Sequence, residues 1–206
     1  MPQYTKNPPM LESDLLADPL AQIEAWVLGA VTAGMQEPHA MTLATVTADH
    51  KPNARMVLYK GMHEGKLTFY TNYQGRKGRE LAANAHVALV FWWDKLERQI
   101  RVEGTVEKLP REMSKQYFAS RPRASQFGAL ASHQSDVVAS RADLDAQLER
   151  LKVQYGNQPV PCPAYWGGYG VTPQVIEFWQ GSRDRMHDRI VYRREGSGWQ
   201  IVRLQP

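Results

Sequence analysis

The feature that most constrains the fold of this chain is a series of short β-prone runs separated by turn-forming residues. Aspartate, asparagine and glycine stand between the runs, which cover residues 41–47, 53–60, 66–71, 86–93 and 98–108. Short runs bounded by turn residues predict strands that pair with their chain neighbours. The spacing therefore predicts an antiparallel meander or barrel, and 206 residues are enough to bury one core.

The last of these runs shows a clear alternation of apolar and polar residues. Ile100, Val102 and Val106 alternate with polar residues, and successive side chains of a strand face opposite sides. One face is therefore expected to be apolar and the other to meet solvent or ligand. Gly104 interrupts the run and predicts a bulge or a close contact.

Helices are predicted on both sides of this β-rich region. Asp18 and Pro19 resemble a helix cap followed by proline at the first helical position, and this helix is expected to end at Gly34. A second helix is expected over residues 110–119. A third is expected after Ser140, where leucines at helical spacing form a packing stripe. Beyond a loop over 158–170 that is rich in Pro and Gly, strands are expected at 175–179, 190–192 and 199–203.

The composition indicates which kinds of partner and ligand the protein can bind. The longest apolar run, Val87–Trp93, is far shorter than the roughly 20 residues that cross a bilayer, and the first residues lack a signal peptide's apolar stretch. We therefore expect a cytoplasmic protein with no membrane partner. The single cysteine, Cys162, predicts neither a disulfide nor a metal framework. The net charge of +4 comes with interspersed acidic residues, which favours small anionic ligands over nucleic acid.

Two cationic segments of the β-rich region are candidates for anion binding. Strand alternation places Arg55 and Lys60 on opposite faces of one run. By itself, such a strand is more often a solvated or salt-bridged edge. Arg76 and Lys77 stand where a strand end leads into a helix. The alternatives are ordinary exposed charges and a bound phosphate, and the phosphate is favoured because cations there oppose the helix dipole.

Two further clusters lie later in the chain. Tyr117, Arg121 and Ser125 offer a phenol, a guanidinium and a hydroxyl in a loop that follows a helix, and all suit phosphate oxygens. Residues 178–189 place several arginines and His187 behind two aromatic residues, where a phosphate or an electron-rich ring could bind. No second histidine or carboxylate stands at zinc-like spacing from His187, so no metal site is expected.

The order and spacing of several segments resemble pyridoxamine 5'-phosphate oxidases. The segments are RMVLYK, FYTNYQGRKGREL, LERQIRVEG, YFASRPRASQFGALASHQS, PAYWGGYGVTP, IEFWQGSRDRMHDR and the terminal RLQP, and together they cover roughly residue 4 to the end. Related FMN split-barrel proteins share the first half, whereas RPRAS joined to WGGY and RMHDR is specific. The resemblance implies a mainly β fold with flanking helices, an antiparallel split β-barrel that binds FMN and forms a homodimer.

Along the chain, the resemblance implies one domain over residues 1–206. Residues 1–18 are expected to form an irregular N-terminal arm, and residues 19–140 the FMN-binding split-barrel core. Residues 141–206 are expected to supply a helix and the C-terminal strands that complete the active site and the dimer interface.

Matching positions imply the site residues. Those expected to bind FMN are Arg55, Met56, Val57, Leu58, Tyr59, Lys60, Tyr70, Thr71, Arg76, Lys77, Gln99, Gln134, Ser135, Trp179 and Arg189. Those expected to bind substrate are Lys60, Tyr117, Arg121, Ser125, Arg185, Met186 and His187, of which Arg185 and His187 are the expected catalytic residues. Two phosphates, each carrying roughly −1.5 to −2 charges, explain such a concentration of cations.

The implied activity is FMN-dependent oxidation of pyridoxamine or pyridoxine 5'-phosphate by molecular oxygen, giving pyridoxal 5'-phosphate and hydrogen peroxide. Protein groups mainly position and polarise in such a reaction, because the flavin carries the redox chemistry. Two alternatives remain: a related FMN oxidase acting on another ring compound, and a non-catalytic protein that binds flavin or pyridoxal phosphate. Ser182 stands where the family usually has glycine, so the loop before Arg185 is expected to differ in shape.

Overall fold

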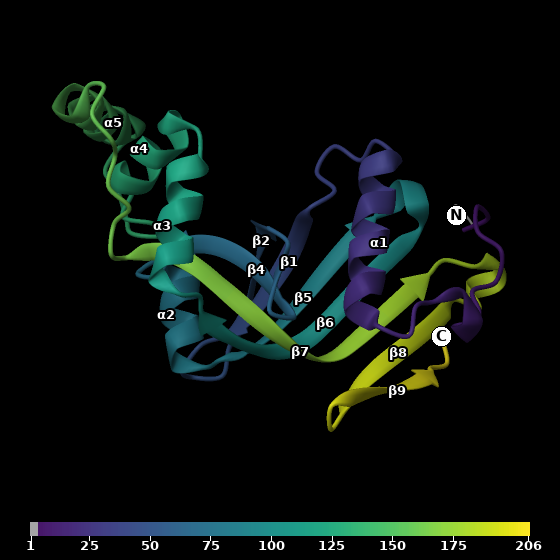
Figure 1. Ribbon diagram of the computed structural model, residues 1–206. Coiled ribbons are helices and arrows are strands. Elements are labelled where there is room, and N and C mark those ends of the chain that lie inside the picture. Colours follow the sequence, from purple (N-terminus) through teal and green to yellow (C-terminus); the bar gives the residue numbers. More distant parts are fainter. Residues whose placement is uncertain (1–3) are drawn as a thin grey trace.

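The computed structural model describes residues 4–206, and its central feature is a nine-stranded antiparallel sheet with flanking helices (Figure 1). The strands are β1 Ala40–Val46, β2 Pro52–Leu58, β3 Met62–His63, β4 Lys66–Asn72, β5 His86–Trp93, β6 Arg98–Lys108, β7 Trp166–Gln180, β8 Asp188–Glu195 and β9 Gly198–Arg203. The helices are α1 Pro19–Thr32, α2 Arg76–Ala83, α3 Arg111–Ser120, α4 Arg123–Ala131 and α5 Arg141–Tyr155. Short 3-10 turns lie at Glu12–Asp14, Asp94–Leu96 and Arg183–Arg185. The predicted fold class, mainly antiparallel β with flanking helices, is confirmed.

The sheet curls until its ends meet. Hydrogen-bonded strands follow the order β2-β1-β5-β6-β7-β4-β3. Directly after β2, the Lys60 amide donates to the Thr68 carbonyl over 2.9 Å, and the Thr68 amide donates to the Gly61 carbonyl over 3.0 Å. These bonds join the end of β2 to β4 and close the barrel. β8 and β9 continue from β7 outside it.

The predicted strands differ from the observed ones mainly at β7. This strand begins at Trp166, whereas the sequence predicted a loop over 158–170 and a strand only from residue 175. The glycines that indicated a loop instead allow close packing within the sheet. A Cβ on Gly167 would lie 2.2 Å from the Tyr73 hydroxyl, and one on Gly168 would lie 2.6 Å from the Leu109 side chain. The two-residue strand β3 was also not predicted.

Gly104 lies at a β-bulge, as its place in the sequence predicted. The register of β6 against β7 shifts between Glu103 and Gly104. A Cβ on Gly104 would lie 2.2 Å from the carbonyl oxygen of Thr172. Up to this point β7 pairs with β4, and beyond it β7 pairs with β8. The bulge therefore marks the place where β7 leaves the barrel.

Gly104→Ala is expected to lower the free energy of unfolding by about 3 kcal/mol, because the added methyl overlaps backbone of the paired strand. Gly29→Ala is the control, since a Cβ there has nothing within 4 Å and lies inside helix α1. That change should be neutral or stabilise by about 0.5–1 kcal/mol. Urea unfolding followed by tryptophan fluorescence compares the two, and equal stabilities would contradict the assigned contact.

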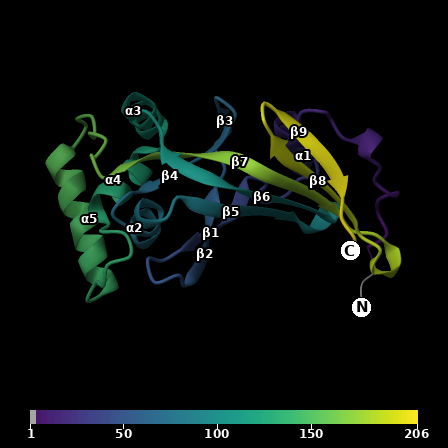
Figure 2. The ribbon, with the colours of Figure 1, turned by 90° about the horizontal axis from the view of Figure 1, so that it is seen from below.

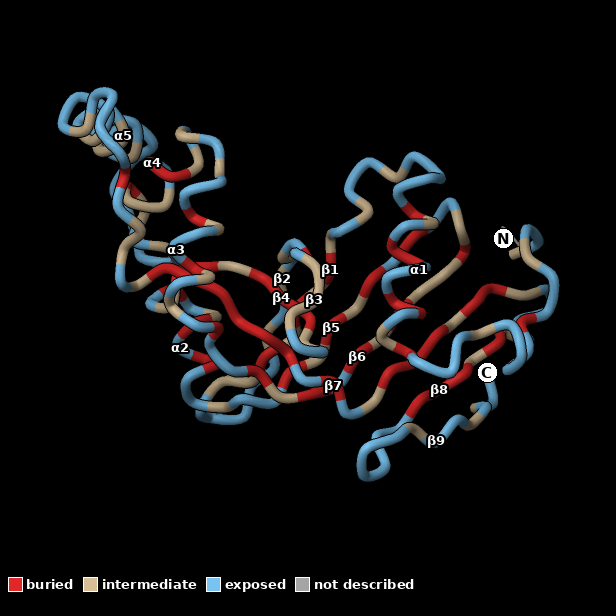
Figure 3. The backbone as a smooth tube through the Cα atoms, in the orientation of Figure 1, coloured by how far each residue is buried: buried red, intermediate tan, exposed pale blue. Residues whose placement is uncertain are grey.

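Helix α1 packs against the apolar side of the sheet, and red segments of the tube mark its buried face (Figure 3). The Asp18 side chain caps the helix by accepting the Leu20 amide over 3.0 Å. Gly34, with φ +64°, follows the last turn. Both ends were predicted. The ring of Trp26 meets Phe178 of β7 at 5.1 Å between centroids, which ties the helix to the sheet.

A smaller apolar cluster lies where α3, α4 and α5 meet the start of β7 (Figure 2). Its buried members are Phe118, Phe127, Val160 and Trp166. Leu148 and Leu151 of the predicted α5 stripe pack here, although no residue of α5 is fully buried. Helix α4 was not predicted, because the segment that contains Arg121 and Ser125 was expected to form a loop after a helix. Pro122 instead occupies the N-cap of α4, so that Ser125 lies on a helix.

β7 connects two distant parts of the molecule (Figure 1). Its first residue, Trp166, packs edge-on against Phe118 of α3. Its last residue, Gln180, donates a side-chain hydrogen bond to the Pro8 carbonyl of the N-terminal segment. An extended strand rises about 3.3 Å per residue, so a strand of this length spans roughly 45 Å. Predicted site residues lie near both of its ends.

Candidate active site

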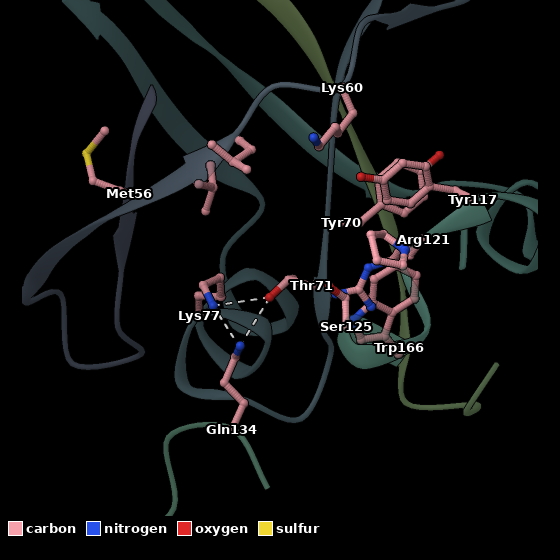
Figure 4. Close-up of a pocket in the computed structure, with 13 residues that line it drawn as sticks. Met56, Lys60, Tyr70, Thr71, Lys77, Tyr117, Arg121, Ser125, Gln134 and Trp166 are labelled. Atoms are coloured by element: carbon pink, nitrogen blue, oxygen red, sulfur yellow. Dashed lines mark hydrogen bonds between the residues drawn. The ribbon is translucent and has the colours of Figure 1, made fainter. Parts of the chain in front are cut away.

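A cavity of about 440 Å³ opens between the barrel and helices α2, α3 and α4 (Figure 4). It is lined by Met56, Val57, Leu58, Lys60, Tyr70, Thr71, Lys77, Tyr117, Arg121, Pro122, Ser125, Gln134 and Trp166. All of these except Pro122 and Trp166 are candidates from the sequence. The fold therefore gathers most of the expected phosphate-binding residues around one space, and we call this space the phosphate cavity.

Aromatic rings hold Arg121 in the phosphate cavity. Its guanidinium lies over the ring of Trp166, 4.7 Å from the centroid. Tyr70 and Tyr117 stack on each other beside it, with centroids 3.9 Å apart (Figure 4). Burial lowers the pKa of Arg121, and its buried Nη1 has no hydrogen-bond partner among residues 4–206. A buried nitrogen without a partner is costly, and an anion bound in the cavity would satisfy it.

Lys77 is a cation of the cavity whose hydrogen bonds go to neutral side chains. It lies in the first turn of α2, and its Nζ donates to Thr71 Oγ1 over 3.1 Å and to Gln134 Oε1 over 2.7 Å (Figure 4). Both partners are neutral. Burial lowers the pKa of Lys77, the charge of Arg55 lowers it further, and Glu80 opposes these effects in part. A phosphate near Lys77 would supply the missing negative charge.

Glu80 ties the neighbouring arginines together. This carboxylate is 5% exposed and accepts hydrogen bonds from Arg55 Nη2 at 2.6 Å, Arg76 Nε at 3.0 Å, Thr45 Oγ1 at 2.6 Å and Asn53 Nδ2 at 2.9 Å. Burial alone would raise the pKa of Glu80, but these hydrogen bonds outweigh burial and lower it to about 2. Glu80 thus holds two predicted cofactor residues beside Lys77, and the sequence did not single it out.

Acid is expected to weaken the fold through Glu80. A carboxyl whose pKa falls from 4.5 to about 2 on folding stabilises the protein above pH 4.5, and this contribution is lost as the pH falls towards 2. Glu80→Gln should therefore lower the free energy of unfolding at pH 7 by about 3 kcal/mol, since Arg55 loses its buried anion. Urea unfolding at several pH values tests this.

Glu149→Gln serves as the control, because Glu149 pairs with Lys152 on the exposed surface of α5. Loss of such a pair should change the free energy of unfolding by less than about 0.5 kcal/mol. A Glu80→Gln protein that keeps the wild-type decline between pH 4.5 and 2 would show that another carboxyl is responsible.

Tyr59 and Ser135 are two of the predicted cofactor residues that lie outside the phosphate cavity. Tyr59 is 2% exposed, and its hydroxyl donates to Glu24 of α1. Its phenol is therefore part of the core. Burial is the main cause that raises the pKa of Tyr59, and the hydrogen bond to Glu24 raises it further. Ser135 lies beside α2, where its hydroxyl accepts the Arg76 amide over 3.1 Å.

A second group of candidates lies at the far end of β7. The register pairs Gln99 of β6 with Trp179 of β7, and Trp179 with Arg189 of β8. Directly opposed residues of adjacent strands face the same side of a sheet, so these side chains form one row. The buried Glu177 accepts from Arg189 Nε over 3.2 Å and from Nη2 over 2.8 Å. Such a row suits a flat ring system.

Arg185, Met186 and His187 follow in the turn between β7 and β8. Asp184 and Arg185 have φ values of +56° and +61°, a left-handed conformation that costs energy in residues other than glycine. The ring of His187 lies 4.8 Å from Trp179 between centroids. Backbone strain of this kind gathers at functional sites. Together with the row on β6–β8, this turn forms what we call the ring cluster.

One chain does not bring the phosphate cavity and the ring cluster together. Trp166 lines the cavity and Trp179 belongs to the ring cluster, and both lie on β7. Their separation along the strand corresponds to roughly 40 Å. No small ligand spans that distance. A single chain therefore carries two separate parts of the site expected from the sequence.

Sequence reasoning missed residues whose roles depend on distant neighbours. Trp166 was taken for part of a loop, although an aromatic residue before two glycines could have indicated a close-packed strand. Tyr4 meets the rings of Trp179 and His187 edge-on, at 5.5 and 5.4 Å between centroids. Glu80 stands four residues after Arg76 on α2, a spacing that could have suggested an ion pair.

The described part of the chain contains neither a metal-binding cluster nor a membrane-spanning helix. Among residues 4–206, no three His, Cys, Asp or Glu side chains are grouped to hold a metal ion. No helix in the same range is both long and apolar enough to cross a bilayer. Cys162 is a half-buried free thiol, and burial raises its pKa.

Comparison with known proteins places the chain in a family. The family model described as pyridoxamine 5'-phosphate oxidase matches residues 28–157. A second model, the pyridoxine 5'-phosphate oxidase C-terminal dimerisation region, matches residues 166–206. A protein of Acaryochloris marina named pyridoxine/pyridoxamine 5'-phosphate oxidase is 52% identical over 197 residues, which cover 96% of this chain and 90% of the relative.

Solved structures show the same fold. PhzG from Burkholderia lata 383, in complex with tetrahydrophenazine-1-carboxylic acid, is 30% identical, with a TM-score of 0.89 and coverage of 94% of this chain and 95% of its own. A pyridoxamine 5'-phosphate oxidase-related, FMN binding protein of Nostoc punctiforme PCC 73102 shares the fold at 13% identity, with a TM-score of 0.74 and coverage of 93% and 100%. On the extent of the matched family models and the identity to the curated relative, this chain belongs to the pyridoxamine 5'-phosphate oxidase family.

Proposed function

We propose that this oxidase-family member converts pyridoxamine or pyridoxine 5'-phosphate into pyridoxal 5'-phosphate, with molecular oxygen as electron acceptor and hydrogen peroxide as product. One observation carries the choice of a phosphorylated substrate. The buried Arg121 Nη1 has no partner among residues 4–206, and it lies in a cavity that also holds Lys60, Tyr117 and Ser125. A phosphate monoester offers the oxygens that these donors need.

The residues around α2 fit the phosphate of FMN. Arg55, Arg76 and Lys77 carry three positive charges and Glu80 carries one negative charge, which leaves a net charge of +2. A phosphate monoester near neutral pH carries roughly −1.5 to −2 charges. When bound, the flavin would take two electrons from the substrate and pass them to oxygen. The chain's own residues bind, orient and polarise.

A homodimer would unite the two parts of the site. We propose that the phosphate cavity of one chain faces the ring cluster of its partner, since within one chain they lie roughly 40 Å apart along β7. The matched dimerisation region, residues 166–206, contains Trp179, Arg185 and His187. A two-fold dimer then holds two identical sites, each built from both chains.

We propose the following roles for the residues of the assembled site. Lys60, Tyr117, Arg121 and Ser125 hold the substrate phosphate, while Arg185, Met186 and His187 approach its ring and reacting carbon. Gln99, Gln134, Ser135, Trp179 and Arg189 contact the flavin. The division into an arm, a core over 19–140 and a C-terminal part over 141–206, together with a cytoplasmic location, completes the proposal.

Another ring substrate is the second candidate, because the PhzG structure at 30% identity holds a tetrahydrophenazine carboxylic acid. Purified protein, incubated in air with pyridoxine 5'-phosphate, should show a bound-flavin spectrum and form aldehyde and peroxide in equal amounts. Unphosphorylated pyridoxine should react about 100-fold less efficiently, since it leaves Arg121 without a partner. Flavin without turnover would favour the other ring substrate or a non-catalytic binding protein.

A further inference from the structure

We infer that the backbone amide of Ser182 fixes the tautomer of His187, so that His187 acts on the substrate as a hydrogen-bond donor through Nε2. The inference rests on the proposed function and deepens it, because it assigns a direction to one hydrogen bond of the site. His187 then polarises the substrate and does not remove a proton from it.

The tautomer follows from the contact between Ser182 and His187. The Ser182 backbone nitrogen lies 3.2 Å from His187 Nδ1. A backbone N–H can only donate, so Nδ1 must be the acceptor and must lack a proton. A neutral imidazole carries one ring proton, which therefore lies on Nε2.

Ser182 is itself held in place by a buried carboxylate. Its hydroxyl donates to Asp188 Oδ2 over 3.1 Å. Asp188 is 9% exposed and also accepts from the Met10 amide over 3.0 Å and from Arg203 Nη1 over 2.8 Å. Both ends of the turn, residues 182 and 188, are thus tied to the body of the protein. The amide that meets His187 keeps its direction, although the turn between them contains strained residues.

Two aromatic rings limit rotation of the imidazole. Tyr4 meets it edge-on at an interplanar angle of 73°, with centroids 5.4 Å apart. Trp179 meets it at 47° and 4.8 Å. A ring flip about the Cβ–Cγ bond would place a carbon opposite the Ser182 amide and lose the hydrogen bond. These contacts therefore favour one orientation of the ring as well as one tautomer.

The assignment constrains how the reaction handles protons. Oxidation at the 4' carbon must release a proton from the hydroxyl or amino group on that carbon. His187 Nε2 already carries a proton, and Nδ1 is occupied by Ser182. His187 therefore does not accept that proton, which passes to solvent water or to another base, and His187 stabilises a substrate oxygen or nitrogen by donating to it.

Nuclear magnetic resonance of the flavin-loaded, nitrogen-15-labelled protein tests the tautomer directly. The His187 signals are identified by their loss in His187→Gln. Nδ1 should resonate as an unprotonated nitrogen and Nε2 as a protonated one. An Nδ1–H tautomer, or signals averaged between both tautomers, would overturn the inference. This readout needs no turnover, so it decides the tautomer even if the proposed reaction proves wrong.

Substitutions distinguish the role of the Ser182 amide from that of its hydroxyl, and a hydrogen-bond donor at Nε2 of His187 from one at Nδ1. Ser182→Ala keeps the backbone N–H and loses the bond to Asp188, while the adjacent Gly181 amide still donates to the Glu97 carbonyl over 2.8 Å and holds the backbone. The tautomer should therefore persist, and its loss would overturn the assignment to the amide. His187→Gln places an amide nitrogen near the position of Nε2, whereas His187→Asn places one near Nδ1. We expect kcat/KM to stay within about tenfold of wild type for Gln and to fall about 100-fold for Asn. Equal losses would overturn the donor role.

Discussion

Coexpressed Arg121→Ala and Arg185→Ala chains are expected to recover about a quarter of wild-type activity, although each variant alone should lose turnover by about 100-fold. The recovery follows from a site built from two chains. Arg121 lies in the phosphate cavity and Arg185 in the ring cluster, at opposite ends of β7. In a mixed dimer, one site carries both lesions and the other carries none. Random pairing makes half of the dimers mixed, with half of their sites intact.

Differently tagged chains allow the mixed dimers to be isolated and their oxidation of pyridoxine 5'-phosphate to be measured. The control mixes Arg121→Ala with Lys60→Ala, whose residues line the same cavity of one chain. Because both residues line the phosphate cavity of the same chain, every site in that mixed dimer carries one substitution, and activity should stay low. Flavin content should remain near wild type in Arg185→Ala. Recovery in the control, or none in the test pair, would contradict a shared site.

Lys77→Met is expected to weaken FMN binding by about 100-fold, which corresponds to about 2.7 kcal/mol. The flavin-free protein should nevertheless be as stable as wild type or slightly more stable. The reason is that burial already lowers the pKa of Lys77, so its charge is costly until an anion binds. Methionine keeps the length of the side chain and removes that charge.

Fluorescence titration with FMN and with riboflavin separates the phosphate from the rest of the cofactor. The variant and the wild type should bind riboflavin equally, because riboflavin lacks the phosphate that Lys77 meets. Lys152→Met is the control, since it removes the same charge from the exposed surface of α5. An equal loss of affinity for both flavins would show that Lys77 shapes the cavity rather than binding phosphate.

Local signals in the sequence were enough to predict most of the barrel. Alternation and turn residues predicted β5 and β6 with the bounds that the structure shows, and Asp18 and Gly34 marked the ends of α1. These signals act between residues that are close in the chain, so a single sequence contains them. The start of β7 was predicted wrongly, because glycines that indicate a loop locally can also permit close packing between strands.

For the candidate site too, some features could be predicted from the sequence and others depend on the tertiary structure. The sequence by itself identified the cationic residues, the clusters in which they follow one another and the family that they resemble. Only the tertiary structure decided which cations meet. In the folded chain, the side chain of Tyr59 lies in the core, and Arg55 and Arg76 donate hydrogen bonds to Glu80. A buried nitrogen of Arg121 has no hydrogen-bond partner within residues 4–206.

The separation of the phosphate cavity from the ring cluster also belongs to the tertiary structure. Trp166 and Trp179 are 13 residues apart in the sequence, and the extended strand β7 places them roughly 40 Å apart. Helical and strand periodicity, caps and turns arise from contacts within a few residues, so the sequence alone determined them. Burial, ion pairing and distance between remote residues arise only when the sheet curls and the helices pack, so the fold alone determined those.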